Sequence, residues 1–288
     1  MRIDELLNEV SGRLERAGIM SARADAELII GHVLGERRGR VQALTMLGTA
    51  IDEDRAERIR ALAGEREDRV PLQHLTGRAP FRTIELSVGP GVFVPRPETE
   101  IVAQFAVDAL AAVPDPSPVA VDLCTGSGAI ALALATEVPT ARVWAVEKSR
   151  EAHAWAERNV RELGDDRVEL ILGDAADAAR LLPPELVGRV HVLISNPPYV
   201  PDDMVPRDPE VREHDPEQAL YGGADGLDLV RAISRTGLDV VAPGGLIVIE
   251  HAEVQGEAIR ALLAADGWRA PATHRDLTLR DRATTAVR

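Results

Sequence analysis

The sequence predicts an α/β protein in which a small helical domain precedes a larger domain built on a parallel sheet. From residue 119 onward, short apolar segments alternate with segments long enough to form helices. Before residue 79, apolar residues instead recur at the spacing of a helix. The 288 residues are enough for two domains of ordinary size. We therefore expect a helical domain in residues 1–78, a β-hairpin linker in residues 79–97 and an α/β domain in residues 98–288.

Three helices are expected in the first domain. One face of the first carries apolar residues three and four positions apart: Ile3, Leu6, Leu7, Val10 and Leu14. Ser21 precedes the apolar segment 24–34 and is the expected N-cap of that helix. Acidic residues open residues 52–68, which suits the positive end of a helix dipole. Together these segments predict a small helical bundle.

The linker contains short extended runs around Phe81, Ile84, Leu86 and Val88. Gly89-Pro90-Gly91 marks a turn, so we interpret this stretch as a hairpin. A helix is then expected from Glu98 to about Ala112, followed by a proline-rich loop.

The remaining elements alternate between strand and helix. Strands are expected at 119–123, 142–146, 168–172, 190–195 and 246–250. Helices are expected at 129–137, 151–163 and 227–241. Helices of this length between strands predict a parallel sheet covered on both faces.

Composition restricts cellular location and cofactor class. No apolar run approaches the ~18–20 residues of a membrane span, and acids stand at the start where a signal peptide has basic residues. Cys124 is the only cysteine, which excludes an internal disulfide and a multi-cysteine zinc site. None of the seven histidines has zinc-like spacing, so no metal is expected. We expect a cytoplasmic protein that does not contact a membrane.

The charge bears on the choice of partner. The formal net charge is −14, with 47 acidic residues against 33 basic ones. The first 90 residues are nearly balanced, so the excess lies in the later part of the chain. A protein that grips a nucleic acid backbone usually has a basic face. Direct binding to nucleic acid is therefore disfavoured, although a local basic patch is compatible with this composition.

A glycine-containing turn follows the first expected strand of the α/β domain, in the run Asp122 to Gly128. Glycines allow a tight turn and close approach to a ligand, but an ordinary strand-to-helix turn explains them equally well. Glu147 lies 19 residues after Gly128 at a strand end, a spacing typical of an acid that binds ribose hydroxyls. Asp174, at the next strand end, is a candidate for an adenine amino group or for a helix cap.

The segment Ser195-Asn196-Pro197-Pro198-Tyr199 follows the fourth strand and carries the strongest signal. Its prolines stiffen the loop. The Asn196 side-chain oxygen and a nearby carbonyl, that of Pro197, suit the two protons of a planar NH₂ group, against which Tyr199 would stack. Hydrogen bonds of this kind return electron density to a delocalised nitrogen and stabilise the charge that develops there. A rigid turn is the purely structural alternative.

This loop resembles the Asn-Pro-Pro-Tyr motif of S-adenosylmethionine-dependent methyltransferases that modify an amino or amide nitrogen. The block Phe93 to Glu100 looks like the Pro-Arg-Pro-acid-Thr-Glu signature of the HemK/PrmC family, the release factor glutamine N5-methyltransferases. Residues 71–77, residues 215–220 and the pair Glu250-His251 are similar to further blocks of that family. The resemblance covers nearly the whole chain.

The resemblance implies a class I (Rossmann-like) methyltransferase domain and transfer of a methyl group from S-adenosyl-L-methionine, leaving S-adenosyl-L-homocysteine. The implied acceptor is the side-chain amide nitrogen (N5) of the glutamine in the Gly-Gly-Gln motif of class I peptide chain release factors, which the helical domain helps to dock. The implied cofactor residues are Cys124, Thr125, Gly126, Ser127, Gly128, Glu147, Asp174, Ala175 and Asn196. The implied catalytic and substrate-binding residues are Asn196, Pro197, Pro198 and Tyr199, with Arg96 and Glu98 as further substrate contacts. A monomer is expected.

Several alternatives stay open. The family often has glycine where Cys124 stands and can have tryptophan where Ala175 stands. Structural ion pairs explain Arg96, Glu98 and Glu100 as well as direct contacts do. The seven acids between residues 202 and 217 suit either a basic surface of a release factor or a solvated loop. The competing functions are a nucleic acid (rRNA, tRNA or DNA) amino-group methyltransferase and a non-catalytic cofactor-binding module.

Overall fold

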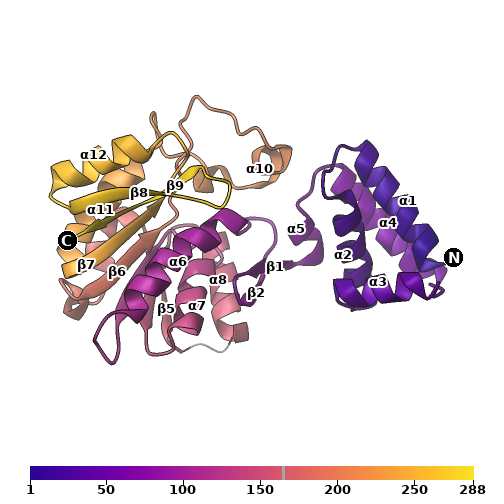
Figure 1. Cartoon of the computed structure of the whole chain (residues 1–288), viewed down its shortest axis with the longest axis horizontal. Helices are drawn as coiled ribbons and strands as arrows, with labels where there is room; N and C mark the ends of the chain where they lie inside the picture. The colour runs from indigo at the N-terminus through magenta and orange to yellow at the C-terminus, as the bar shows by residue number, and fades with distance from the viewer. Residues whose placement is uncertain (164–165) are drawn as a thin grey trace. The chain divides into compact units, whose positions relative to one another are not determined.

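The computed structural model describes residues 1–163 and 166–288 (Figure 1). The chain forms two compact units. The helical unit comprises residues 1–78 together with residues 207–214, and the sheet unit comprises residues 79–206 together with residues 215–288. The short segment 207–214 thus joins the helical unit although it lies within the sequence of the sheet unit. Within the described residues, no helix is both long and apolar enough to span a bilayer.

The helical unit packs its helices around one apolar core. The helices are α1 (Ile3–Arg16), α2 (Ala22–Leu34), α3 (Arg38–Met46), α4 (Glu53–Glu67), α5 (Leu72–Thr76) and, from the inserted segment, α10 (Pro209–His214). The five apolar residues expected on the inner face of α1 are all buried, which confirms that face. Asp52 caps α4 by accepting a hydrogen bond from the Arg55 N–H at 2.9 Å.

Ser21 occupies the N-cap position of α2, as predicted. Its side chain, however, makes no capping hydrogen bond. Its backbone angles, φ −94° and ψ 19°, are not the extended ones from which an N-cap oxygen reaches the first turn.

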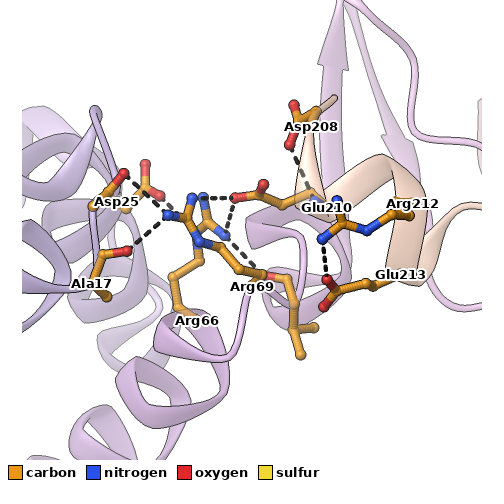
Figure 2. Close-up of polar contacts among 10 residues, drawn as sticks. Ala17, Asp25, Arg66, Arg69, Asp208, Glu210, Arg212 and Glu213 are labelled. Atoms are coloured by element: carbon orange, nitrogen blue, oxygen red, sulfur yellow. Dashed lines mark hydrogen bonds and ion pairs between the residues drawn. The ribbon is translucent and has the colours of Figure 1, made fainter. Parts of the chain in front are cut away.

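An ion-pair network anchors the inserted segment within the helical unit (Figure 2). The Arg66 guanidinium donates to Asp25 and to Glu210, each at 2.8 Å. Arg69 donates to the same Glu210 oxygen at 3.3 Å and to the Ala17 carbonyl at 2.7 Å. A charge that is removed from water requires an opposite charge nearby. These contacts therefore hold α10 in place beside the other helices of its unit.

A short hairpin, β1 (Arg78–Phe81) and β2 (Ile84–Ser87), lies at the start of the sheet unit, which begins at Ala79. The hairpin was expected, but its turn is not Gly89-Pro90-Gly91. The chain reverses at Arg82 and Thr83, where Arg82 has φ +51°. A two-residue hairpin turn requires positive φ, which the sequence does not signal when arginine occupies that place.

Seven strands form the central sheet in the order β5-β4-β3-β6-β7-β9-β8. The first five positions in that order pair in parallel, whereas β9 pairs antiparallel with both β7 and β8. The strands are β3 (Val119–Leu123), β4 (Arg142–Glu147), β5 (Val168–Leu172), β6 (Val190–Ser195), β7 (Val241–Glu250), β8 (Arg269–Arg275) and β9 (Asp281–Val287). The sheet is therefore mixed rather than wholly parallel, because the last two strands, which the sequence analysis missed, form an antiparallel edge.

Helices cover both faces of this sheet (Figure 1). One face carries α6 (Pro97–Ala111), α7 (Ala129–Glu137) and α8 (Arg150–Leu163), and the other carries α9 (Ala178–Leu181), α11 (Asp228–Val240) and α12 (Gly256–Asp266). Neighbouring strand residues point to opposite cores: Ala120 packs with the first group of helices and Val121 with the second. Short 3₁₀ turns at Ala175–Asp177, Pro184–Leu186 and Glu217–Ala219 complete the fold. The doubly covered α/β architecture is as predicted.

Candidate active site

The glycine-containing turn and the Asn-Pro-Pro-Tyr loop meet at the carboxyl edge of the sheet. Strand β3 lies between β4 and β6, and its last residue, Leu123, is paired with Ser195. The Ser195 hydroxyl donates to the Leu123 carbonyl at 2.7 Å and ties the two strand ends together. The order of strands reverses here, which is where open α/β sheets bind their ligands. The topology therefore brings together two motifs about 70 residues apart in sequence.

A buried carboxyl group shapes the glycine-containing turn. Asp122 is fully buried, and its Oδ2 accepts from the Thr125 hydroxyl at 2.5 Å and from the Ala131 N–H at 3.1 Å. Its Oδ1 has no hydrogen-bond partner among the described residues. Burial raises the pKa of Asp122 to about 7, although these two hydrogen bonds act against that rise.

Cys124 occupies the turn in a left-handed conformation, with φ +62°. A side chain at such an angle is strained, which explains why glycine suits this place. The turn nevertheless forms with cysteine at this position. Burial raises the pKa of its thiol, which makes it a poor nucleophile. Nothing in its surroundings assigns it a reactive role.

The rest of the turn is open on one side and supported on the other. A Cβ placed on Gly126, which has φ +58°, would meet no atom within 4 Å. On the supported side, Asn159 of α8 donates to the Ser127 carbonyl and to the Ser87 carbonyl, each at 2.9 Å. Asn159 is buried and was not singled out from the sequence, because its partners lie far away along the chain.

The two acids expected at neighbouring strand ends both lie at this edge. Glu147 accepts hydrogen bonds from the Gly126 N–H at 2.8 Å and from the Ser149 N–H at 2.7 Å. Asp174 accepts from the Ala176 N–H at 3.0 Å, as a cap of the following 3₁₀ turn, and pairs with Lys148 at 2.8 Å. The Lys148 contact and the hydrogen bond from Ala176 lower the pKa of Asp174, and burial acts against this shift. Ala175 beside it is buried.

The Asn196 side chain is held by the first turn of α6. Its Nδ2 donates to the Thr99 hydroxyl at 3.4 Å, and Thr99 in turn donates to Glu250 at 3.2 Å. Thr99 lies within the Phe93 to Glu100 block, so that block and the Asn-Pro-Pro-Tyr loop are in direct contact. Sequence reasoning grouped these segments by resemblance but did not identify Thr99 or Glu250 as site residues.

A second loop supports the Asn-Pro-Pro-Tyr loop from behind. A Cβ on Gly222 would collide with the Pro198 carbonyl, and one on Gly226 would collide with the Tyr199 carbonyl. Gln255 donates to that same Tyr199 carbonyl at 2.9 Å. The sequence signal for this support, the glycines of Gly222-Gly223 and Gly226, was present but was not used. Tyr199 itself is half-buried, and burial raises the pKa of its hydroxyl.

Several of the other charged residues predicted to contact the substrate or a partner protein form ion pairs within this chain. Arg96 donates to Asp215 at 2.6 Å and lies 4.9 Å from the centre of the Phe93 ring, whereas Glu98 is half-buried at the start of α6. Asp215 and Glu210 are two of the seven acids expected on a solvated or partner-facing loop. Both bind arginines of this chain instead, so that expectation was wrong for these two.

Both ring nitrogens of the buried residue His251 are within hydrogen-bond distance of other groups of the chain. Its Nδ1 lies 2.8 Å from the Ala252 carbonyl and its Nε2 lies 2.9 Å from the Thr284 hydroxyl. These contacts indicate a structural role for His251. The described residues contain no cluster of histidine, cysteine and acidic side chains suited to hold a metal ion.

Comparison with known proteins identifies the family. The PrmC N-terminal domain model matches residues 5–77, and the methyltransferase small domain model matches residues 83–207. The release factor glutamine methyltransferase of Streptomyces coelicolor is 48% identical over 280 residues, which cover 96% of this chain and 95% of that protein. The chain belongs to the release factor glutamine methyltransferase family. The family predicted from the sequence is thereby confirmed, as is its class of enzyme, a methyltransferase.

Relatives with similar sequence identity to this chain can carry names that specify different methyl acceptors. The 4-amino-L-phenylalanine/4-methylamino-L-phenylalanine methyltransferase of Streptomyces pristinaespiralis is 38% identical, covering 99% of this chain and 94% of that protein. Among solved structures, a methyltransferase from Pyrococcus furiosus aligns with a TM-score of 0.50 at 17% identity, over 70% of this chain and 87% of that one. The last comparison supports the methyltransferase fold.

Proposed function

We propose that this protein transfers a methyl group from S-adenosyl-L-methionine to the side-chain amide nitrogen of the glutamine in the Gly-Gly-Gln motif of class I peptide chain release factors. One observation carries the proposal beyond family membership. The Asn196 amide is held by Thr99 at the edge where the glycine-containing turn also lies. A planar amide acceptor and a methyl donor would thus meet in one place.

The turn fits the proposed cofactor. It offers open space at Gly126 and a buried Asp122 oxygen without a hydrogen-bond partner among the described residues. When bound, S-adenosylmethionine would supply an electrophilic methyl group. The residues proposed to hold it are Cys124, Thr125, Gly126, Ser127, Gly128, Glu147, Asp174, Ala175 and Asn196. Glu147 would accept from the ribose hydroxyls, since each of its oxygens keeps a second lone pair beside its backbone hydrogen bond.

The acceptor side of the reaction follows from the orientation of Asn196. Its Nδ2 is turned to Thr99, so the opposite edge of the amide presents Oδ1. That oxygen and the Pro197 carbonyl would accept the two N–H groups of the glutamine, while the Tyr199 ring would cover its flat face. These acceptors stabilise the positive charge that grows on nitrogen, and the proton becomes acidic only after transfer. Positioning of donor and acceptor would supply much of the remaining acceleration.

The proposed partner is a protein, with the helical unit contributing to its docking. The acidic balance of the chain supports a protein acceptor over an unaided grip on nucleic acid. Arg96 and Glu98, at the start of α6, are the further proposed contacts, although Arg96 already pairs with Asp215. Because release factors act on ribosomes, we propose that the reaction takes place in the cytoplasm, with the enzyme as a monomer.

The proposal is tested by incubating the protein with methyl-labelled S-adenosylmethionine and a class I release factor, then mapping the label. We expect the label on the glutamine of Gly-Gly-Gln, and none on a release factor in which that glutamine is replaced by glutamate. Ribosomal RNA, transfer RNA and 4-amino-L-phenylalanine serve as competing acceptors. Label on one of these and none on the release factor would overturn the proposal.

A further inference from the structure

Glu250 is a buried carboxyl group that the expected cofactor and acceptor residues leave unexplained. It ends β7, beside the end of β6 from which Asn196 continues. Its side chain is 2% exposed, and its Oε2 has no hydrogen-bond partner among the described residues. No described residue forms an ion pair with it. A buried acid in this condition costs folding free energy, so a functional reason for it is worth seeking.

Thr99 connects this acid to the acceptor loop. A hydroxyl group has one hydrogen to donate and lone pairs with which to accept. The Thr99 hydrogen is directed to Glu250 Oε1, at 3.2 Å. The Thr99 oxygen is therefore left to accept, and it does so from Asn196 Nδ2 at 3.4 Å. The three side chains form a relay in which the direction of each hydrogen bond fixes the next one.

The relay selects one of the two orientations of the Asn196 amide. With Nδ2 held by Thr99, Oδ1 faces the other way and is available to an N–H donor. If the amide turned over, it would present N–H groups to the N–H groups of the acceptor, which would repel. An ionised Glu250 accepts only, so it prevents Thr99 from donating to Asn196 and stabilising that reversed orientation.

We propose that Glu250 is a positioning residue that acts through Thr99 to hold the Asn196 amide with Oδ1 toward the methyl acceptor. This inference rests on the proposed function for the identity of the acceptor, a primary amide. The relay itself lies wholly within the sheet unit. Through Thr99, the threonine of the Pro-Arg-Pro-acid-Thr-Glu block, the relay assigns that block a role in orienting Asn196.

The protonation state of Glu250 determines how strongly one direction of the hydrogen bonds in the relay is favoured. A protonated Glu250 can itself donate to Thr99, which frees the Thr99 hydrogen to turn toward Asn196 Oδ1. Burial raises the pKa of Glu250 to about 7, against the opposing effects of Thr99 and Arg282. The other titratable groups whose charges interact with it are Glu98 on α6 and Tyr199 on the acceptor loop. The proposed orientation should therefore strengthen as pH rises through the neutral range.

The test compares Thr99→Val and Glu250→Gln with Thr99→Ser, which retains the hydroxyl. Glu253→Gln is the matched control, because Glu253 is an exposed acid three residues beyond Glu250. We expect Thr99→Val and Glu250→Gln to lower kcat for release factor methylation by about 10- to 100-fold, by analogy with residues that orient the ligands of a metal. KM for the release factor and affinity for S-adenosylhomocysteine should change less than roughly threefold, since neither contact is to those ligands. Thr99→Ser and Glu253→Gln should stay within about threefold of the unmodified protein.

Two further readouts separate orientation from general structure. The kcat of the unmodified protein should rise between about pH 6 and pH 8, and Glu250→Gln should remove that rise. In protein labelled with ¹⁵N-asparagine, the Asn196 side-chain signal is identified by its loss in Asn196→Asp. Its N–H exchange with solvent should be slower in the unmodified protein than in Thr99→Val.

The inference is overturned if Thr99→Val and Glu250→Gln keep normal kcat, or if Thr99→Ser loses as much kcat as Thr99→Val. Unchanged N–H exchange of Asn196 in Thr99→Val would also overturn it. The exchange measurement needs no methyl acceptor. A protein that fails to methylate the release factor but shows the expected exchange difference would contradict the proposed function while supporting the relay.

Discussion

The two units of this methyltransferase differ in whether their buried or largely buried carboxylates are paired with cations. In the helical unit, Asp25 and Glu210 share the guanidinium of Arg66, and Glu210 also contacts Arg69 (Figure 2). In the sheet unit, Asp122 and Glu250 are buried with no ion-pair partner among the described residues, and each leaves one oxygen without a hydrogen bond.

The pKa values express this contrast. Burial alone would raise the pKa of Glu210, but its contacts with Asp208 and Arg66 lower it to about 2. Burial raises the pKa values of Asp122 and Glu250 to about 7. Acids that anchor one part of a fold to another are neutralised by cations, whereas the two acids beside the candidate active site are not. Uncompensated burial of this kind is a mark of functional sites.

The largest effect is expected from breaking the ion-pair network of the helical unit. Arg66→Met leaves Asp25 buried without a cation, and a buried charge deprived of its partner costs about 3–5 kcal/mol of unfolding free energy. Arg58→Met, at an exposed position of the same helix, is the control and should change the value by less than about 0.5 kcal/mol. Denaturant unfolding followed by circular dichroism measures both. Equal stability of the two variants would contradict the importance of the network.

On the side of the sheet unit, Asn196→Ala should lower kcat for methyl transfer by about 100-fold or more, as removal of a preorganised hydrogen-bonding group does. Binding of S-adenosylhomocysteine, measured by calorimetry, should persist because the glycine-containing turn is untouched. This result would exclude a non-catalytic cofactor-binding module. Retention of full activity would instead remove Asn196 from the proposed chemistry.

The two units should respond to pH with opposite signs. The lowered pKa of Glu210 contributes stability that is present above about pH 4.5 and is lost as pH falls toward 2. The raised pKa of Glu250 means that the folded state keeps a proton which the unfolded state has released. Stability of the sheet unit should therefore fall as pH rises from about 4.5 to 7, and level off above that. Each effect is on the order of 3 kcal/mol.

Single substitutions assign these effects. Glu210→Gln should weaken the acid dependence, and Glu250→Gln should flatten the decline between pH 4.5 and 7, with Asp122→Asn removing a further part of it. Unfolding free energies measured at several pH values provide the comparison. A decline of unchanged slope in both Glu250→Gln and Asp122→Asn would show that these acids are not the source.

The smallest expected effect concerns Cys124. In most places alanine is more stable than glycine, but at φ +62° the order should reverse, because the Cβ is strained there. We expect Cys124→Gly to be more stable than Cys124→Ala by about 1 kcal/mol. Thermal unfolding of the two variants tests this directly. The usual order, with alanine more stable, would mean that the turn relaxes around the side chain.

The sequence predicted those features that depend on local pattern. Strand and helix alternation, the inner face of α1 and the Asn-Pro-Pro-Tyr loop are all encoded within a few neighbouring residues. What it did not predict depends on partners distant along the chain. Thr99 and Glu250 are 151 residues apart, and Arg66 and Glu210 are 144 apart. Nothing near Glu210 in the sequence indicates that its cation lies 144 residues earlier in the chain.

The antiparallel edge and the hairpin turn were missed for related reasons. Strand β8 carries little apolar patterning because most of its residues are at least partly exposed. The turn at Arg82 lacks the glycine or asparagine that usually marks positive φ. The Arg82 side chain instead binds Glu137 and Gln104, so tertiary contacts hold a backbone angle that local preference disfavours.

The membership of residues 207–214 in the helical unit has a consequence for how this protein is divided in the laboratory. A cut after residue 78 would not separate two independent modules, because α10 would be left without the arginines that bind Glu210. The first 78 residues, made alone, would likewise lose a helix of their own unit. A truncation at residue 78 would therefore remove stabilising contacts from both fragments. Exchange of the helical unit between relatives requires that both segments be transplanted together.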